Sequence, residues 1–213
     1  MAWSCGSSSN IKGVDVSADQ GSQIGTESYW SSLKQDGYRF GFIKATEGTS
    51  YKDPYLAGAW SGCNAVNGLD LTYLYHFLDW DTSGETQANH FWSVISGLRD
   101  PTFDSYKTVL AVDVEENLST GTPSMTIVND FINRLLALGA NSANFVIYTN
   151  YDTWVNYLKN PKTWDYLAVW LAAFNGIAWC PDYTFGGWPN WSYMQYGKET
   201  LLGAVTDVDE MNA

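Results

Sequence analysis

Basic residues are scarce in this sequence. Its 213 residues include 11 Lys and Arg but 23 Asp and Glu, which gives a net charge of -12 at pH 7. A chain with this balance has no electrostatic attraction to nucleic acid phosphates or to anionic membranes. Long apolar runs are also missing, so no stretch is hydrophobic enough to span a bilayer. We therefore expect no nucleic acid and no membrane among the partners.

Cysteines are few, and none of the three, Cys5, Cys63 and Cys180, belongs to a C-x-x-C pair. A structural zinc site is therefore not expected, and we expect neither a metal nor an organic cofactor. The three thiols leave two states open, one disulfide with a free cysteine or no disulfide at all.

The first residues lack the basic region and the apolar run of a signal peptide. We expect residues 1–10 to be a tail, either a mature start or an added residue, and residues 11–213 to form one folded domain. A secreted protein seen without its leader fits this beginning best.

Aromatic residues are abundant, with 11 Trp and 14 Tyr. Such rings fill large hydrophobic cores. Their flat faces also stack on the apolar faces of pyranose sugars. Composition leaves a large core and a sugar-binding cleft equally open.

Strand-like and helix-like segments alternate along most of the chain. Strands are predicted at 11–17, 38–48, 71–80, 107–115, 144–150, 166–174, 191–197 and 204–212. Helices are predicted at 27–37, 53–68, 83–98, 122–140 and 151–160. The last three strands lie too close together for full strand–helix units. The pattern favours a single-domain α/β fold, a TIM-like barrel with eight strands and about five helices, (β/α)5(β)3.

Polar or aromatic residues stand where nearly every predicted strand ends: Asp15, Glu47, His76, Asp113 with Glu115, Tyr148, Trp170, Gln195 and Asp209. In a parallel barrel, the active site lies at the carboxyl ends of the strands. Acids at several of these ends therefore predict an acidic cleft rather than a simple exit of the chain into solvent.

The stretch VLAVDVEEN at 109–117 carries the sharpest signal. Side chains alternate along a strand, so Asp113 and Glu115 face one side and Glu116 the other. Like charges this close resist joint ionisation, which raises one pKa. A neutral acid beside an ionised one suits glycosidic cleavage. Glu115, farther along the strand, is the better candidate for the general acid, and Glu116 receives no role.

Two acids on one strand are poorly placed to flank a scissile bond from opposite faces. The substrate's 2-acetamido group can attack in place of a second carboxylate, with Asp113 as an orienting base. Alternatively, Asp209 or Asp15 supplies the second face. The sequence leaves these mechanisms open.

Each candidate also has a purely structural interpretation. Asp15 could cap a turn, and His76 could be a hydrogen-bonded core histidine. His90 lies in a helical pattern and is expected to be structural. Tyr148 and Trp170 fit a core as well as a sugar platform. Asp207 and Asp209 share one face of their strand, and we expect only one of the two to point into the cleft.

An ordered set of motifs from Gly13 to Asn212 resembles glycoside hydrolase family 25, the lysozymes also called Chalaropsis-type muramidases. The motifs are GVDVSADQG, GFIKATEGTSYKDPYL, YLYHF, VLAVDVE, FVIYTNYDTW, VWLAAF and GAVTDVDEMN. The resemblance implies a barrel of eight strands and five helices. It also implies hydrolysis of the β-1,4 bond between N-acetylmuramic acid and N-acetylglucosamine in peptidoglycan.

Carried over by motif, the resemblance makes Glu115 the acid and Asp113 its partner. It assigns Asp15 to the first strand and Asp209 to the last, as residues that hold the reacting sugar. The positions that match the family's groove are Glu47, Tyr75, His76, Tyr148 and Gln195.

The sequence departs from the family at the rim. Met194 precedes Gln195 where Trp is usual, and Phe174 stands where Tyr is frequent. The ending VDEMN carries one residue more than the common VD-x-N. These differences concern substrate preference more than activity.

We therefore predict a secreted, monomeric lysozyme acting on bacterial peptidoglycan. Because bacterial walls are themselves anionic, activity is expected to be best in acidic or salty conditions.

Two other classes of function stay open. One is a chitinase-like barrel glycosidase, although the family 18 signature D-x-x-D-x-D-x-E is missing. The other is a non-catalytic sugar-binding barrel, against which all the expected acids are present.

Overall fold

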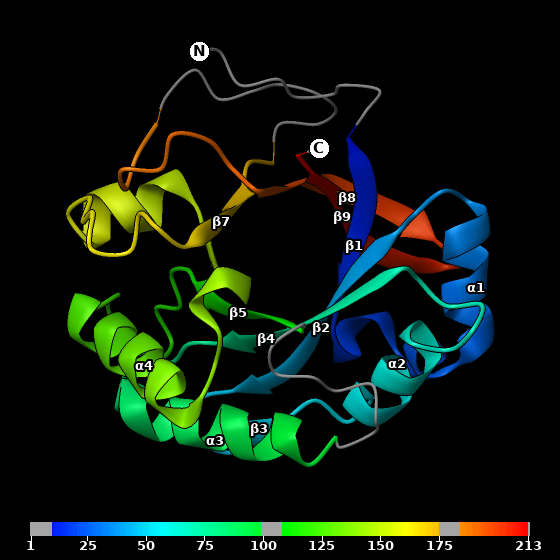
Figure 1. The fold of residues 1–213 in the computed structure, drawn as a ribbon, viewed down its shortest axis with the longest axis horizontal. Coiled ribbons are helices and arrows are strands. Elements are labelled where there is room, and N and C mark those ends of the chain that lie inside the picture. The colour runs from blue at the N-terminus through cyan, green and yellow to red at the C-terminus, as the bar shows by residue number, and fades with distance from the viewer. Residues whose placement is uncertain (1–9, 99–107, 175–183, 213) are drawn as a thin grey trace.

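A closed barrel of eight strands dominates the residues that the computed structural model describes, 10–98, 108–174 and 184–212 (Figure 1). Its strands are β1 (Ile11–Val16), β2 (Phe40–Glu47), β4 (Leu71–Phe77), β5 (Val109–Val114), β6 (Phe145–Thr149), β7 (Ala168–Ala172), β8 (Tyr193–Leu201) and β9 (Ala204–Met211). Pairing between β1 and β2 closes the ring, and the short strand β3 (Tyr51–Lys52) joins the edge of β2. The predicted α/β barrel is confirmed.

Helices lie on the outside of the barrel and cover part of its circumference (Figure 1). They are α1 (Glu27–Gln35), α2 (Leu56–Cys63), α3 (Gly84–Ser96), α4 (Met125–Leu138) and the π-helical turn η4 (Asp152–Tyr157). The 3-10 turns are η1 (Ala18–Gln20), η2 (Ser22–Gly25) and η3 (Ser142–Asn144). In the described part of the chain, the five helices that the sequence predicted are therefore present. None of the described helices is long and apolar enough to cross a membrane.

Helix α4 shows why these segments are helical. Val128, Phe131, Ile132 and Leu135 are buried at spacings of three and four residues, which places them on one face. The helix ends at Gly139, whose φ of 107° is left-handed and costs a glycine little.

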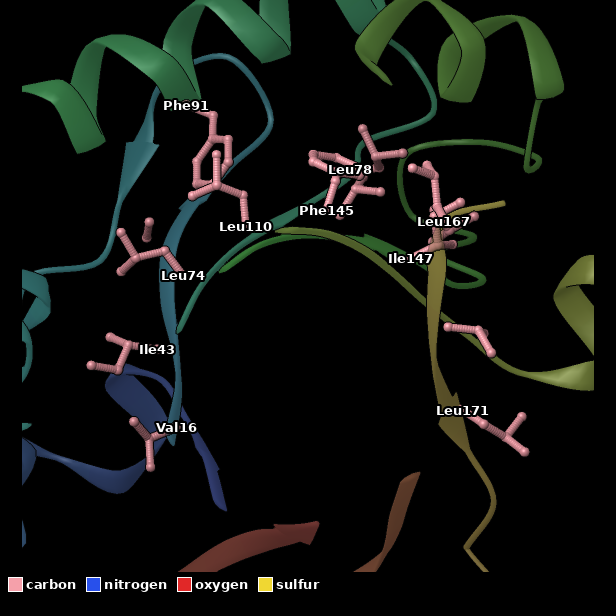
Figure 2. Packing of buried hydrophobic residues seen from close by; sticks show 14 of the residues in the cluster. Val16, Ile43, Leu74, Leu78, Phe91, Leu110, Phe145, Ile147, Leu167 and Leu171 are labelled. Atoms are coloured by element: carbon pink, nitrogen blue, oxygen red, sulfur yellow. The ribbon is translucent and has the colours of Figure 1, made fainter. Parts of the chain in front are cut away.

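Strand side chains alternate between the outer helices and the barrel interior. Figure 2 shows outward-facing Val16, Ile43 and Leu74 beneath the helical layer. The interior is filled by Phe40, Phe42, Tyr73, Tyr75, Ala111, Val146, Tyr148, Trp170 and Tyr193. Phe42 stacks on Trp170 with ring centroids 3.9 Å apart. This aromatic plug forms a floor beneath the carboxyl ends of the strands.

The last strand runs against its neighbours. Strand β9 pairs antiparallel with both β8 and β1, whereas the other barrel pairs are parallel. Leu202 and Gly203 join β8 to β9 with φ values of 52° and 89°, which suit a two-residue hairpin. A parallel pair would need a crossover of about a dozen residues. Strand β9 therefore begins at the mouth and its carboxyl end, with Asp209, lies deep in the barrel, so the prediction that Asp209 lies at the mouth with the other strand ends is wrong.

Of the three cysteines, Cys63 lies in the described part of the chain, and Cys5 and Cys180 lie outside it, as does most of the predicted tail. The Cys63 thiol is free and buried, and it accepts a hydrogen bond from Thr72 Oγ1 at 3.1 Å. Burial raises the pKa of this thiol to about 12. Cys63 is therefore an inert core residue.

Candidate active site

A polar cavity opens at the carboxyl ends of the parallel strands, above the aromatic plug. Its lining consists of Asp15, Ser17, Asp19, Gln20, Lys44, Tyr75, Phe77, Asp113, Glu115, Tyr148, Trp170, Phe174, Gln195, Lys198 and Asp207. Carboxylates therefore share one cavity with aromatic faces, although they come from strands far apart in the sequence.

Strand β5 delivers the two acids predicted for it. Asp113 and Glu115 both line the cavity, while Val114 between them is buried in the outer core. Glu116 faces away and accepts a hydrogen bond from the Tyr157 hydroxyl at 2.6 Å. Strand alternation alone produces this arrangement.

The β5 acids are strongly coupled. Burial and then the charge of Glu115 raise the pKa of Asp113 well above its usual value. Burial also raises the pKa of Glu115, whereas Lys44 and Lys198 oppose that rise. A buried carboxyl and a partly buried one that repel each other retain one proton between them over a wide pH range. The pair is thus suited to give up and take back a proton at moderate pH.

Asp15, at the end of β1, is held from one side by an amide. Gln195 donates a hydrogen bond from Nε2 to Asp15 Oδ2 at 2.8 Å. The Tyr148 hydroxyl donates to Gln195 Oε1 at 2.9 Å, which fixes the orientation of the amide. Burial and the charge of Asp207 raise the pKa of Asp15 to about 7.

The sequence of residues 14–204 matches the family model for glycosyl hydrolases family 25. The chain belongs to this family. Lysozyme M1 of Streptomyces globisporus is 34% identical over 215 residues, covering 94% of this chain and 67% of the relative. A bacterial lysozyme structure from Streptomyces coelicolor is 28% identical with a TM-score of 0.78, covering 97% of this chain and 94% of the other. A GH25 lysozyme structure from Aspergillus fumigatus is 28% identical with a TM-score of 0.77, and the match covers 96% of this chain and 95% of the other. The resemblance is confirmed.

In the last strand of this family 25 chain, the acid that lines the cavity is Asp207 and not the predicted Asp209. Asp209 is fully buried beneath the cavity, where its Oδ1 accepts a hydrogen bond from Trp170 Nε1 at 2.8 Å. Asp207 takes the expected place in the cavity lining, and Lys198 Nζ lies 3.5 Å from its Oδ1. The cause is the antiparallel direction of β9, whose register places Asp207 beside Asp15 and Asp209 beside Gly13, deeper in the barrel.

His76 does not reach the cavity of this family 25 barrel either. Its Nδ1 is hydrogen-bonded to Thr46 Oγ1 at 2.7 Å and its Nε2 to Gln87 Oε1 at 3.1 Å. The ring stacks on Phe131 of α4. Burial lowers the pKa of His76 to about 3, so the ring is neutral. Because Tyr75 points into the cavity, strand alternation turns His76 outward.

The second histidine, His90, lies on α3, and its Nε2 meets the Tyr51 carbonyl oxygen at 2.9 Å. This contact agrees with a structural role.

Glu47 lies beside the cavity and is not part of its lining. Its Oε2 accepts a hydrogen bond from Lys44 Nζ at 2.6 Å. Lys44 itself lines the cavity, so Glu47 affects the site through this lysine and through its own charge, which helps to raise the pKa of Asp113. Of the remaining predicted positions, Tyr75, Tyr148, Trp170 and Gln195 line the cavity.

Sequence reasoning preferred Asp209 to Asp207, which shares its face. The lining residues that it missed altogether are Ser17, Asp19, Gln20, Lys44, Phe77 and Lys198. Lys44 could have been found from the sequence. It is the only lysine in β2 and lies on the same face of the strand as the inward-facing Phe42, so its charged end needs a polar cavity. Within the residues that the structure describes, no three His, Cys, Asp or Glu side chains are arranged so that they could hold a metal ion.

Proposed function

We propose that the protein hydrolyses the β-1,4 bond between N-acetylmuramic acid and N-acetylglucosamine in bacterial peptidoglycan. The observation that carries the proposal is the coupled pair Asp113 and Glu115, which lines one cavity at the end of β5. Membership in family 25 supports it, as do relatives described as lysozymes.

Glu115 acts as the general acid, because it stands beyond the last residue of β5 and nearest the mouth. It protonates the glycosidic oxygen while the bond from that oxygen to the anomeric carbon breaks, and the bonding electrons stay with the oxygen. Water then forms the new bond to the anomeric carbon and returns a proton to Glu115.

Asp113 lies deeper on the same strand, and this supports a role on the same side as Glu115. It accepts a hydrogen bond from the N–H of the substrate's 2-acetamido group, whose oxygen assists departure of the leaving group. Asp15 and Asp207, from β1 and β9, add negative charge where positive charge develops on the sugar ring. Tyr75, Tyr148 and Trp170 supply the apolar floor against which the sugar is positioned.

A peptidoglycan substrate also supports the proposal that the protein is secreted and acts outside the cell that produces it. The residues that line the cavity all belong to one chain, which supports action as a monomer.

The deciding experiment digests purified peptidoglycan, reduces the new ends with borohydride and identifies them by mass spectrometry. Wild type is compared with Glu115→Gln, and with Glu116→Gln as a matched control whose side chain faces away from the cavity. Reduced N-acetylmuramic acid ends are expected with wild type and the control, and at least about a hundredfold fewer with Glu115→Gln.

Reduced N-acetylglucosamine ends would contradict the proposed bond specificity. A loss of less than about tenfold in Glu115→Gln would contradict its role as general acid. No new ends at any pH would favour a chitinase-like activity or a non-catalytic sugar-binding barrel.

A further inference from the structure

Asp209 is an ionisable residue that the proposed reaction does not use. It is fully buried, and it lies below the cavity rather than in its lining. Trp170 Nε1 donates to its Oδ1 at 2.8 Å, whereas its Oδ2 has no hydrogen-bond donor among the described residues. A buried carboxylate oxygen without a donor is costly if the group is ionised. The arrangement therefore favours a protonated carboxyl.

The carboxyl of Asp209 shares a hydrogen bond with the carboxyl of Asp15. The two residues lie on neighbouring strands, where Gly13 pairs with Asp209 and Asp15 with Asp207. Carboxylates have no proton to donate, so a hydrogen bond between two carboxyls requires that one of them keeps its proton.

The surroundings decide which carboxyl keeps the proton. Asp15 already accepts a hydrogen bond from Gln195 and borders the cavity, where water and substrate can stabilise its charge. Asp209 has no exposed surface. The ionised form therefore belongs at Asp15 and the proton at Asp209.

We infer that Asp209 is a positioning residue, which keeps its proton and donates a hydrogen bond to Asp15, so that Asp15 faces the cavity as an oriented, ionised acceptor. Together with Gln195, it holds Asp15 from below and from the side. The kinetic consequence of this inference rests on the proposed function, whereas the protonation state of Asp209 does not.

The titration of the cluster agrees with this assignment. Burial and the charge of Asp15 raise the pKa of Asp209 well above its usual value, while the Trp170 hydrogen bond lowers it. Hydrogen bonds from Gln195 and Asp209 lower the pKa of Asp15 and so oppose the effect of burial.

Charged or titratable groups approach Asp209 from four strands. They are Asp15 on β1, Tyr148 on β6, Tyr196 on β8 and Asp207 on β9. All four are acidic groups, whose ionisation disfavours a charge on Asp209.

The test compares Asp209→Asn with Asp209→Leu. An asparagine amide can donate to Asp15 while its oxygen still accepts from Trp170, and leucine can do neither. We expect Asp209→Leu to lose at least about tenfold in kcat/KM on peptidoglycan and to shift the acid limb of the pH–rate profile upward. Asp209→Asn should recover most of that loss. By contrast, Asp207→Asn removes a charge from the cavity and should lose activity.

Inactivity of Asp209→Asn comparable to that of Asp209→Leu would overturn the inference, because it would mean that a charge is required at this position. The inference would also fall if Asp209→Leu retained the wild-type profile.

A second measurement does not depend on activity. A carboxyl whose pKa is raised by folding binds its proton more tightly when folded, so its contribution to stability falls as pH rises above the unfolded value of about 4. The midpoint of thermal unfolding of wild type should therefore fall more steeply from pH 5 to pH 8 than that of Asp209→Asn. Equal slopes, with a lower midpoint for the variant throughout, would show that Asp209 is ionised.

This second measurement also separates the two proposals. If wild type releases no products, the proposed function fails, but the difference in slope still decides whether Asp209 carries a proton.

Discussion

Gln195 of β8 donates from Nε2 to Oδ2 of Asp15 of β1 at 2.8 Å, and this contact links two strands that are separated by β9 in the barrel. The donor is neutral, so it stabilises the ionised form of Asp15 without neutralising the charge that the cavity presents. The contact therefore controls both the position and the ionisation of Asp15.

Gln195→Met keeps the length of the side chain but removes the donor. The pKa of Asp15, already raised to about 7, should rise further, so the acid limb of the pH–rate profile should move to higher pH. Loss of a hydrogen bond to a buried carboxylate should also cost about 1–3 kcal/mol of unfolding free energy. Gln35→Met, at the exposed end of α1, is the control, and an unmoved acid limb would contradict the role of this contact.

Lys44→Met tests the electrostatic control of Asp113 and Glu115, the pair that we propose carries out catalysis. Lys44 lowers the pKa values of both Asp113 and Glu115, so both should rise when its charge is removed. We expect the whole pH–rate profile to move up by as much as about one pH unit, equivalent to about 1.4 kcal/mol. Lys52→Met, which removes an exposed charge from β3, should leave the profile in place. A profile equally unchanged in both variants would exclude Lys44 from this role.

His76→Ala should affect stability rather than catalysis. The variant removes a fully buried ring that packs on Phe131 and hydrogen-bonds to Thr46 and Gln87. Its unfolding free energy should fall by about 2–4 kcal/mol, while kcat/KM per folded molecule stays close to wild type. A rise in KM with unchanged stability would instead indicate that His76 contacts the substrate.

The difference in unfolding free energy between wild type and His76→Ala should depend on pH, because folding lowers the pKa of His76 from about 6.5 to about 3. The unfolded chain binds the proton more tightly, so the stability supplied by neutral His76 is lost as pH falls below about 6.5. The gap in unfolding free energy between wild type and His76→Ala should therefore narrow in acid. A gap of constant size across this pH range would contradict the lowered pKa of His76.

Strand periodicity predicted the barrel and the placement of Asp113 and Glu115, because both follow from short-range alternation along β5. The same rule, applied to Tyr75 and His76, would have shown that adjacent residues of β4 cannot both face the cavity. The motif resemblance outweighed that argument at the sequence level.

The direction of the last strand was harder to predict. It depends on the two-residue link Leu202–Gly203, a hairpin signal that the strand pattern alone does not include. The choice between Asp207 and Asp209 follows from this direction, since both share a face. The irregular pairing after Lys44 on β2, where the register shifts before Thr46, depends on contacts with β4 and has no marker within β2 itself.

Net charge provides the last prediction, which concerns binding to the wall rather than chemistry. A chain with a net charge of -12 is repelled by an anionic wall at low ionic strength, and salt at about 0.15 M shortens the range of that repulsion to about 8 Å. Lysis of intact walls at pH 7 should therefore rise when salt is added. As pH falls toward about 5, protonation of Asp15 should slow the chemistry, but the ratio of wall lysis to cleavage of an uncharged fragment should rise because surface carboxylates begin to protonate. A short uncharged glycan fragment, cleaved under the same conditions, is the control for effects on the catalytic groups themselves. If wall lysis and fragment cleavage respond identically to salt and to pH, wall repulsion does not limit lysis.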